Sequence, residues 1–272
     1  MGDRSSHRAG VFKYGEAAGE RVEDRLAAEE PLEIRVSGQP LTVVMRTPGH
    51  DRDLTLGLLF GEGIIRRFSD VEAITVLPNG EHPDLENVID VKLGPDSPGV
   101  AQRWQRNFVS ASSCGLCGVS SIEAIHAAAP PLPDDDFRID PEIVYALEAR
   151  LRTEQRIFAS TGGLHAAGLF RLGGEPVVVR EDIGRHNAVD KAIGYALQEG
   201  LVPLERHILM VSGRTSFEIV QKALQARIPV LVAVSAPSSL ARDLAQASNQ
   251  TLIGFVRGRS LNVYSGRRRV AA

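Results

Sequence analysis

Residues 207–234, HILMVSGRTSFEIVQKALQARIPVLVAV, decide the fold of the C-terminal half. An apolar run at 207–211 is typical of a buried strand, and a polar loop follows it at 212–216. Residues 217–226 have helical spacing, and 229–234 is an apolar run typical of a strand in a parallel sheet. Strands that alternate with helices in this way predict an α/β fold whose mostly parallel sheet is covered on both faces.

The alternation continues on both sides of this stretch. Upstream, Asp140 and Pro141 begin a predicted helix as N-cap and first helical residue, and Gly162-Gly163 ends it. Further strands and helices are expected at 166–170, 177–179, 189–197, 240–247, 252–256 and 261–264.

The N-terminal half predicts a smaller α+β unit. Strands at 32–36 and 41–45 form a hairpin, Asp53 caps a helix that ends near Gly63, and strands follow at 73–77 and 88–93. Residues 1–30 are expected to be a mobile tail with an acidic end, and 130–136 a proline-stiffened, solvated linker. Arg267-Arg268-Arg269 is expected to be a solvated tail. We therefore predict two domains, 1–130 and 131–272.

Composition narrows the class of protein. The chain has 272 residues, 43% hydrophobic and 24% charged, which is ordinary for a globular protein. Its net charge of −3 argues against a general nucleic-acid or membrane-surface binder. The N-terminus is polar and no apolar run approaches about 20 residues, so we expect a cytoplasmic protein.

The charge is unevenly distributed. Residues 1–130 carry 13 basic and 19 acidic side chains, whereas 131–272 carry 18 and 15. Of the 31 basic residues 27 are arginine, which reflects either codon bias or a need to grip phosphates.

Two cysteines, Cys114 and Cys117, are the only ones in the chain and lie in the glycine-rich segment 110–119. Residues 120–129 have helical character, and a thiol at a helix N-terminus has a lowered pKa and reacts as a thiolate. Four interpretations stay open: a structural pair, half of a zinc site shared with another chain, a thiol–disulfide switch, and a sulfur carrier that holds a persulfide.

Three polar loops follow predicted strands: 180–187, 212–216 and 235–239. Ligands of open α/β sheets bind at the carboxyl ends of the strands. Arg185, His186 and Arg214 lie in these loops, beside hydroxyls and predicted helix N-termini. Each loop alone is explained by helix capping, but together they favour an anionic ligand. His165 is expected to be a core or capping histidine.

Six segments occur together and in order: CGLCG at 114–118, TGGLHAA at 161–167, EDIGRHNAVDK at 181–191, SGRTSFE at 212–218, SAPSSLA at 235–241 and GFVRGR at 254–259. Over residues 12–266 the chain resembles the FdhD family of formate dehydrogenase accessory sulfurtransferases.

The resemblance implies a cytoplasmic, homodimeric maturation factor. Such a protein takes sulfur from a cysteine desulfurase as a persulfide. It passes the sulfur to the molybdenum bis(molybdopterin guanine dinucleotide) cofactor before insertion into formate dehydrogenase. It also implies a cytidine-deaminase-like, three-layer αβα C-terminal domain. The zinc signature of deaminases, His-x-Glu with Pro-Cys-x-x-Cys, is absent from the sequence, so deaminase chemistry is not expected.

The resemblance also implies site residues. Cys114 carries the persulfide and Cys117 assists sulfur release by forming a disulfide. The segment Phe255, Val256, Arg257, Gly258, Arg259 and Ser260 matches the cofactor-binding segment of the family, and guanine nucleotides serve as mimics of the cofactor. Two rival functions remain, a cofactor-holding chaperone without catalysis and a thiol–disulfide oxidoreductase.

Overall fold

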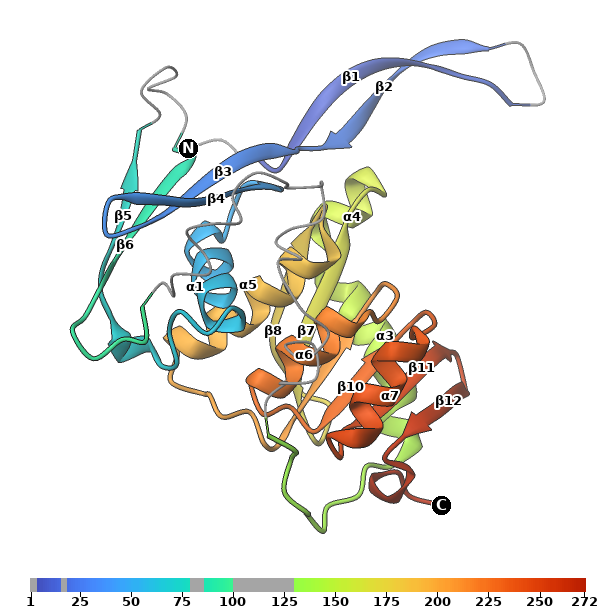
Figure 1. Cartoon of the computed structure of the whole chain (residues 1–272). Helices are drawn as coiled ribbons and strands as arrows, with labels where there is room; N and C mark the ends of the chain where they lie inside the picture. The colour runs from blue at the N-terminus through green and yellow to red at the C-terminus, as the bar shows by residue number, and fades with distance from the viewer. Residues whose placement is uncertain (1–3, 16–18, 79–85, 100–129) are drawn as a thin grey trace.

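The computed structural model describes residues 4–15, 19–78, 86–99 and 130–272 (Figure 1). Its elements fall into a six-stranded sheet with helices on both faces, a four-stranded sheet with one helix, and a two-stranded ribbon. The chain is therefore mixed α/β, as the sequence predicts.

The six-stranded sheet has the order β12-β11-β10-β9-β7-β8. Its strands are β7 (His165–Arg171), β8 (Pro176–Asp182), β9 (His207–Val211), β10 (Val230–Ala233), β11 (Thr251–Arg257) and β12 (Ser260–Ser265). Only β9, β10 and β11 pair in parallel, and the other three pairings are antiparallel. The prediction of a mostly parallel sheet is therefore wrong, because tight turns join β7 to β8 and β11 to β12 as hairpins.

Alternate side chains of this sheet enter two separate cores. Leu209 and Val211 face helices α5 (Arg185–Gln198), α6 (Phe217–Gln225) and α7 (Ser239–Ala247). Ile208 and Met210 face α3 (Pro141–Glu154), which covers the opposite side. The period of two along a strand thus produces three layers, helix, sheet and helix. This arrangement confirms the predicted three-layer architecture.

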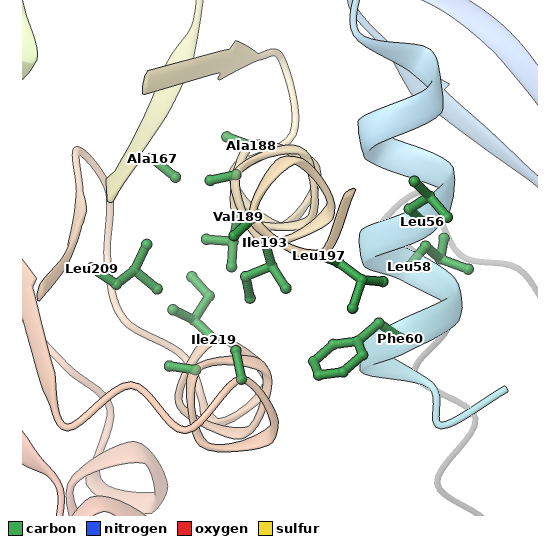
Figure 2. Close-up of a cluster of buried hydrophobic side chains, with 14 of the residues drawn as sticks. Leu56, Leu58, Phe60, Ala167, Ala188, Val189, Ile193, Leu197, Leu209 and Ile219 are labelled. Atoms are coloured by element: carbon green, nitrogen blue, oxygen red, sulfur yellow. The ribbon is translucent and has the colours of Figure 1, made fainter. Parts of the chain in front are cut away.

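The four-stranded sheet has the order β4-β3-β6-β5, with strands β3 (Glu30–Val36), β4 (Gln39–Arg46), β5 (Val71–Leu77) and β6 (Val88–Leu93). The predicted hairpin is confirmed as β3 and β4. Helix α1 (Asp51–Gly61) packs between this sheet and α5, and a short 3-10 helix, η1 (Phe68–Asp70), precedes β5. Figure 2 shows Leu56, Leu58 and Phe60 of α1 in one core with side chains of α5 and α6. The predicted division at residue 130 stays a prediction, and the larger core contains residues from both sides of it.

Two glycines let α1 and α5 approach closely. A Cβ on Gly57 would lie 1.9 Å from the backbone oxygen of Asp190, and one on Gly194 would lie 1.8 Å from that of Asp53. Any side chain at either position would therefore push the helices apart.

The helix starts and ends differ from the predictions in two places. His50, with φ 55°, is the N-cap of α1, so Asp53 lies inside the first turn, where its carboxylate pairs with Arg180 at 2.9 Å. The helix begun by Asp140 ends at Glu154, and a separate helix, α4 (Arg156–Thr161), continues to Gly162. The predicted N-cap is confirmed, since the Asp140 side chain accepts a hydrogen bond from the Glu142 backbone N–H.

The expected N-terminal tail is instead an ordered ribbon. Strands β1 (Ser6–Lys13) and β2 (Glu20–Ala27) pair only with each other, and Figure 1 shows them extending away from the body. Most side chains of both strands are exposed and neither strand alternates apolar and polar residues, so the sequence pattern did not indicate strands here.

The C-terminal arginines are not a solvated tail. The three arginines form a short 3-10 helix, η3 (Arg267–Arg269). Arg269 is fully buried, and its guanidinium pairs with the Asp135 carboxylate at 2.8 Å. Leu132 is buried in the larger core and its N–H donates to the Ser248 carbonyl at 3.0 Å, so the segment 130–136, predicted as a solvated linker, lies packed against the body. A buried arginine needs such a partner, and Asp135 supplies it.

Candidate functional site

The candidate site lies along one edge of the six-stranded sheet. Strands β8, β9, β10 and β11 run in the same direction, so their carboxyl ends share this edge with the start of β7. The loops predicted to meet there do meet. The Thr215 N–H donates to the Ala236 carbonyl at 3.1 Å, and the Phe255 N–H donates to the Ser235 carbonyl at 3.3 Å.

Positive charge is concentrated at this edge. Arg185 lies in the first turn of α5 and exposed Arg214 lies in the loop after β9. Burial lowers the pKa of His165, and the nearby Arg185 and Arg214 guanidinium groups lower it further. Neither arginine has an ion pair among the residues described, and the Arg185 Nε is buried without a hydrogen-bond partner. Unpaired guanidinium groups beside helix N-termini suit an anionic group.

His186 forms a polar chain across two elements. Its Nε2 lies 3.0 Å from the Ser216 hydroxyl at the start of α6 and 3.8 Å from a Glu218 carboxylate oxygen. Burial first, and the Arg185 charge second, lower the pKa of His186 to about 4. His186 is therefore neutral at neutral pH, and its Nε2 shares a hydrogen bond with the Ser216 hydroxyl.

Some side chains of the segment 255–260 are exposed at the sheet edge, and others contact the body of the protein. Phe255 is 38% exposed and has φ 53°, a left-handed conformation rare for an aromatic residue, at an irregularity in the β11–β12 pairing. The Val256 side chain is buried in the smaller core, so only its backbone is available to a ligand. Arg257, Gly258 and Ser260 are exposed, whereas the Arg259 guanidinium pairs with Glu142 of α3.

Much of the segment 181–191 builds the fold rather than the site. The Asp182 carboxylate pairs with Lys191 at 2.7 Å, and both side chains are buried. Asp182 also accepts from the Thr47 and Gly184 backbone N–H groups, and Lys191 donates to the Thr47 carbonyl. This network joins β4 to the start of α5 and so orients Arg185 and His186.

A hollow that the sequence does not reveal adjoins the edge. It has a volume of about 340 Å³ and lies where α3, α4 and β7 meet, with His165 and Ser212 in its wall. Another hollow of about 310 Å³ lies at the start of α1. Two of its three carboxylates are already paired, Asp51 with Arg46 and Asp53 with Arg180. The first hollow is therefore the better candidate for a ligand.

The predicted cysteine site, Cys114 and Cys117, lies outside the described residues. Within those that are described, no helix is long and apolar enough to cross a membrane, and no cluster of three or more His, Cys, Asp or Glu side chains could hold a metal.

A family model described as the FdhD/NarQ family matches residues 27–271. The chain belongs to the FdhD/NarQ family. Curated relatives within it include sulfur carrier protein FdhD of Streptomyces avermitilis, 48% identical over 98% of this chain and 96% of the relative. The protein of the same name from Sulfolobus acidocaldarius is 44% identical over 91% of this chain and 92% of its own length.

A solved structure supports the fold. It is the crystal structure assigned to a formate dehydrogenase accessory protein of Desulfotalea psychrophila, with a TM-score of 0.80 and 22% identity. The similarity covers 98% of this chain and all of that one. At this identity it shows that the two chains share a fold.

Proposed function

We propose that this chain is a sulfurtransferase of the cytoplasm. It accepts sulfur from a cysteine desulfurase as a persulfide on Cys114 and delivers it to the molybdenum bis(molybdopterin guanine dinucleotide) cofactor that formate dehydrogenase needs. The relatives named as sulfur carriers support the first half of this proposal. The second half rests on one observation: Arg185 and Arg214, beside helix N-termini at the sheet edge, have no ion pair with any residue that the structure describes.

The loading step is thiolate exchange at sulfur. The Cys114 thiolate attacks the terminal sulfur of the donor's persulfide, the donor's S–S bond breaks, and the donor's cysteine leaves as a thiolate. The sulfur is thereby transferred without net oxidation or reduction, and Cys114 holds it as a persulfide.

The delivery step releases sulfide. The Cys117 thiolate attacks the inner sulfur of the Cys114 persulfide, the persulfide bond breaks, and sulfide leaves to become a molybdenum ligand. The two cysteines are oxidised to a disulfide in this step, and a cellular dithiol reductant restores them.

The sheet edge binds the molybdenum cofactor, the cargo, while the sulfur is delivered. Arg185 and Arg214 pair with its phosphates, and the first turns of α5 and α6 add backbone N–H donors. Because His186 is neutral, it leaves the positive charge of this edge to the arginines alone.

Two variants test sulfur loading and cofactor binding separately. In a strain that lacks this protein, Cys114→Ser is expected to leave formate dehydrogenase inactive while still binding guanosine diphosphate like the wild type. Arg214→Ala is expected to load with sulfur normally but to bind guanosine diphosphate about 10- to 150-fold more weakly.

Arg206→Ala is the matched control, because Arg206 is exposed and precedes β9 at the opposite edge of the sheet. It should behave as wild type in both assays. Full rescue of formate oxidation by Cys114→Ser would favour the non-catalytic chaperone instead.

A further inference from the structure

One face of the β1–β2 ribbon is rich in arginine. Residues that lie directly opposite each other in an antiparallel pair present their side chains on the same face, and every second residue of a strand shares that face. Arg8 lies opposite Arg25, and two positions farther along Phe12 approaches Arg21 in the same way. The face, which we call the basic face, therefore consists of Arg8, Gly10, Phe12, Arg21, Glu23 and Arg25.

The protein itself does not neutralise the charge of the basic face. The Arg8 guanidinium pairs with the Glu23 carboxylate at 2.9 Å, and both side chains are exposed. The Arg21 and Arg25 guanidinium groups have no ion pair or side-chain hydrogen bond with any residue that the structure describes. Like charges directly opposite one another destabilise an antiparallel pair, so an anionic group bound beside Arg8 and Arg25 would stabilise the ribbon.

Phe12 gives the basic face an apolar contact point. Its side chain is 68% exposed. Beside it, Arg21 crosses the ribbon over Gly10, where an added Cβ would lie 3.1 Å from the Arg21 Nη2. Aromatic and arginine side chains are the types most enriched at the centres of protein–protein interfaces. The basic face therefore has the composition of a protein-binding surface.

The ribbon is placed to reach another molecule. Within the described chain, β1 and β2 pair only with each other and contain no buried side chain, and Figure 1 shows them extending away from the body. Strands of eight residues span about 26 Å. A two-stranded hairpin with neither face covered is marginally stable in water, so contact with another molecule would stabilise it.

The charges of the chain argue against two kinds of partner. Residues 1–130 carry 13 basic and 19 acidic side chains, so the half of the chain that bears the ribbon repels nucleic acid. A symmetric dimer through the basic face would place arginines against arginines, because a two-fold axis brings a surface against its own copy. An acidic surface of a different protein is therefore the partner that the charges favour.

The base of the ribbon lies close to the sheet edge. β2 contacts α4, and a Cβ on Gly163, just after α4, would lie 3.4 Å from the Ala27 Cβ at the end of β2. α4 also lines the hollow that adjoins the sheet edge. A protein bound along the ribbon would therefore be held beside the edge from which the cofactor has to leave.

We propose that the basic face docks an acidic surface of the enzyme that receives the cofactor. The identity of this enzyme, formate dehydrogenase, rests on the proposed function. The arginines pair with its carboxylates, and Phe12 packs into an apolar part of the same surface.

Binding of cofactor-free formate dehydrogenase, measured by biolayer interferometry, tests the inference. Arg25→Glu should weaken binding at least about tenfold, because it places a carboxylate against the acidic surface. A glutamate opposite Arg8 also suits the ribbon, so the variant is expected to fold. Arg66→Glu is the matched control, because it makes the same change at an exposed position outside the ribbon and should bind like the wild type. Added salt should weaken binding by the wild type more than by Arg25→Glu.

Equal affinity of Arg25→Glu and Arg66→Glu, or no binding by the wild type, would overturn the inference. Light scattering gives the oligomeric state of the same samples. A loss of self-association confined to Arg25→Glu would assign the basic face to a second copy of the chain and would also overturn it. Arg25→Glu should load with sulfur and bind guanosine diphosphate like the wild type. Absence of both from the wild type would instead overturn the proposed function.

Discussion

The Asp182–Lys191 pair is the most consequential buried contact at the scale of single residues. Both charges are out of water, and each has backbone partners as well. Lys191→Ala leaves the Asp182 carboxylate buried without its cation, so we expect a loss of about 3–5 kcal/mol in the free energy of unfolding. Urea denaturation followed by circular dichroism measures this change.

Lys92→Ala is the control for Lys191, because it removes an exposed ion pair with Glu72. Such pairs contribute about 0–1 kcal/mol. Equal losses in the free energy of unfolding from the two substitutions would show that the buried pair stabilises the protein no more than the exposed one.

His186 makes the stability depend on pH. Its pKa is about 4 in the folded protein and 6.5 in the unfolded chain, so the unfolded state binds more protons between these values. Stability associated with His186 is therefore present above pH 6.5 and is lost as the pH falls toward 4, by about 3 kcal/mol at most. In His186→Gln this part of the pH dependence should disappear, as thermal unfolding from pH 4 to 8 will show.

His165, His50 and His207 also have lowered pKa values, so the wild type and His186→Gln share a remaining slope. Only the difference between the two proteins reports on His186. Identical pH profiles would mean that the His186 ring titrates normally.

Residue types alone predicted where Arg185, His186 and Arg214 would gather, because carboxyl ends of neighbouring strands share an edge. They did not reveal that Asp182 and Lys191 stabilise the fold, since the identity of a charged residue does not show whether it contacts a ligand or a buried partner. The role of Arg269 was missed for the same reason, because Asp135 lies 134 residues away in the chain.

At the scale of elements, the crossing of α1 and α5 depends on two glycines. Gly194→Ala places a methyl group against the Asp53 backbone oxygen, which cannot move without shifting α1. We expect a loss of at least about 2 kcal/mol in the free energy of unfolding, measured by urea denaturation.

Gly61→Ala provides the comparison on α1. Its Cβ would meet the end of the flexible Lys222 side chain at 3.0 Å, and alanine favours a helix over glycine by about 1 kcal/mol. A small change is expected here. If Gly194→Ala proves as mild, the helices are not held in contact by these glycines.

Most strands and helices of the C-terminal half were predictable, because their apolar residues follow a period of two or of 3.6. The strand predicted at 207–211 has the same bounds in the structure. The division of the predicted helix, from Pro141 to the glycines at 162–163, into α3 and α4 was not predictable, because Glu181 caps α4 from a distant strand.

At the scale of the whole molecule, the β1–β2 ribbon is separate from the cores. It contributes no residue to either hydrophobic cluster as described, and Phe12 and Leu26 are exposed on it. Replacing residues 6–27 by a short glycine linker should therefore lower the melting temperature by less than about 2 °C. A larger fall in a calorimetric scan would show that the ribbon supports the body.

The order of the strands could not be obtained from the sequence. Local patterns identify a strand but not its neighbour, so β7 was not expected to lie between β8 and β9 in opposite direction. The hollow beside α3 is likewise a product of tertiary packing, because its walls come from residues between 148 and 234.

Intact-mass spectrometry after incubation with a cysteine desulfurase and cysteine tests whether Cys114 carries sulfur. We expect a gain of about 32 Da, one sulfur atom, that a thiol reductant removes. Cys117→Ser should still gain this mass, whereas Cys114→Ala should not. Loading of Cys114→Ala to the level of the wild type would show that Cys114 is not the sulfur carrier.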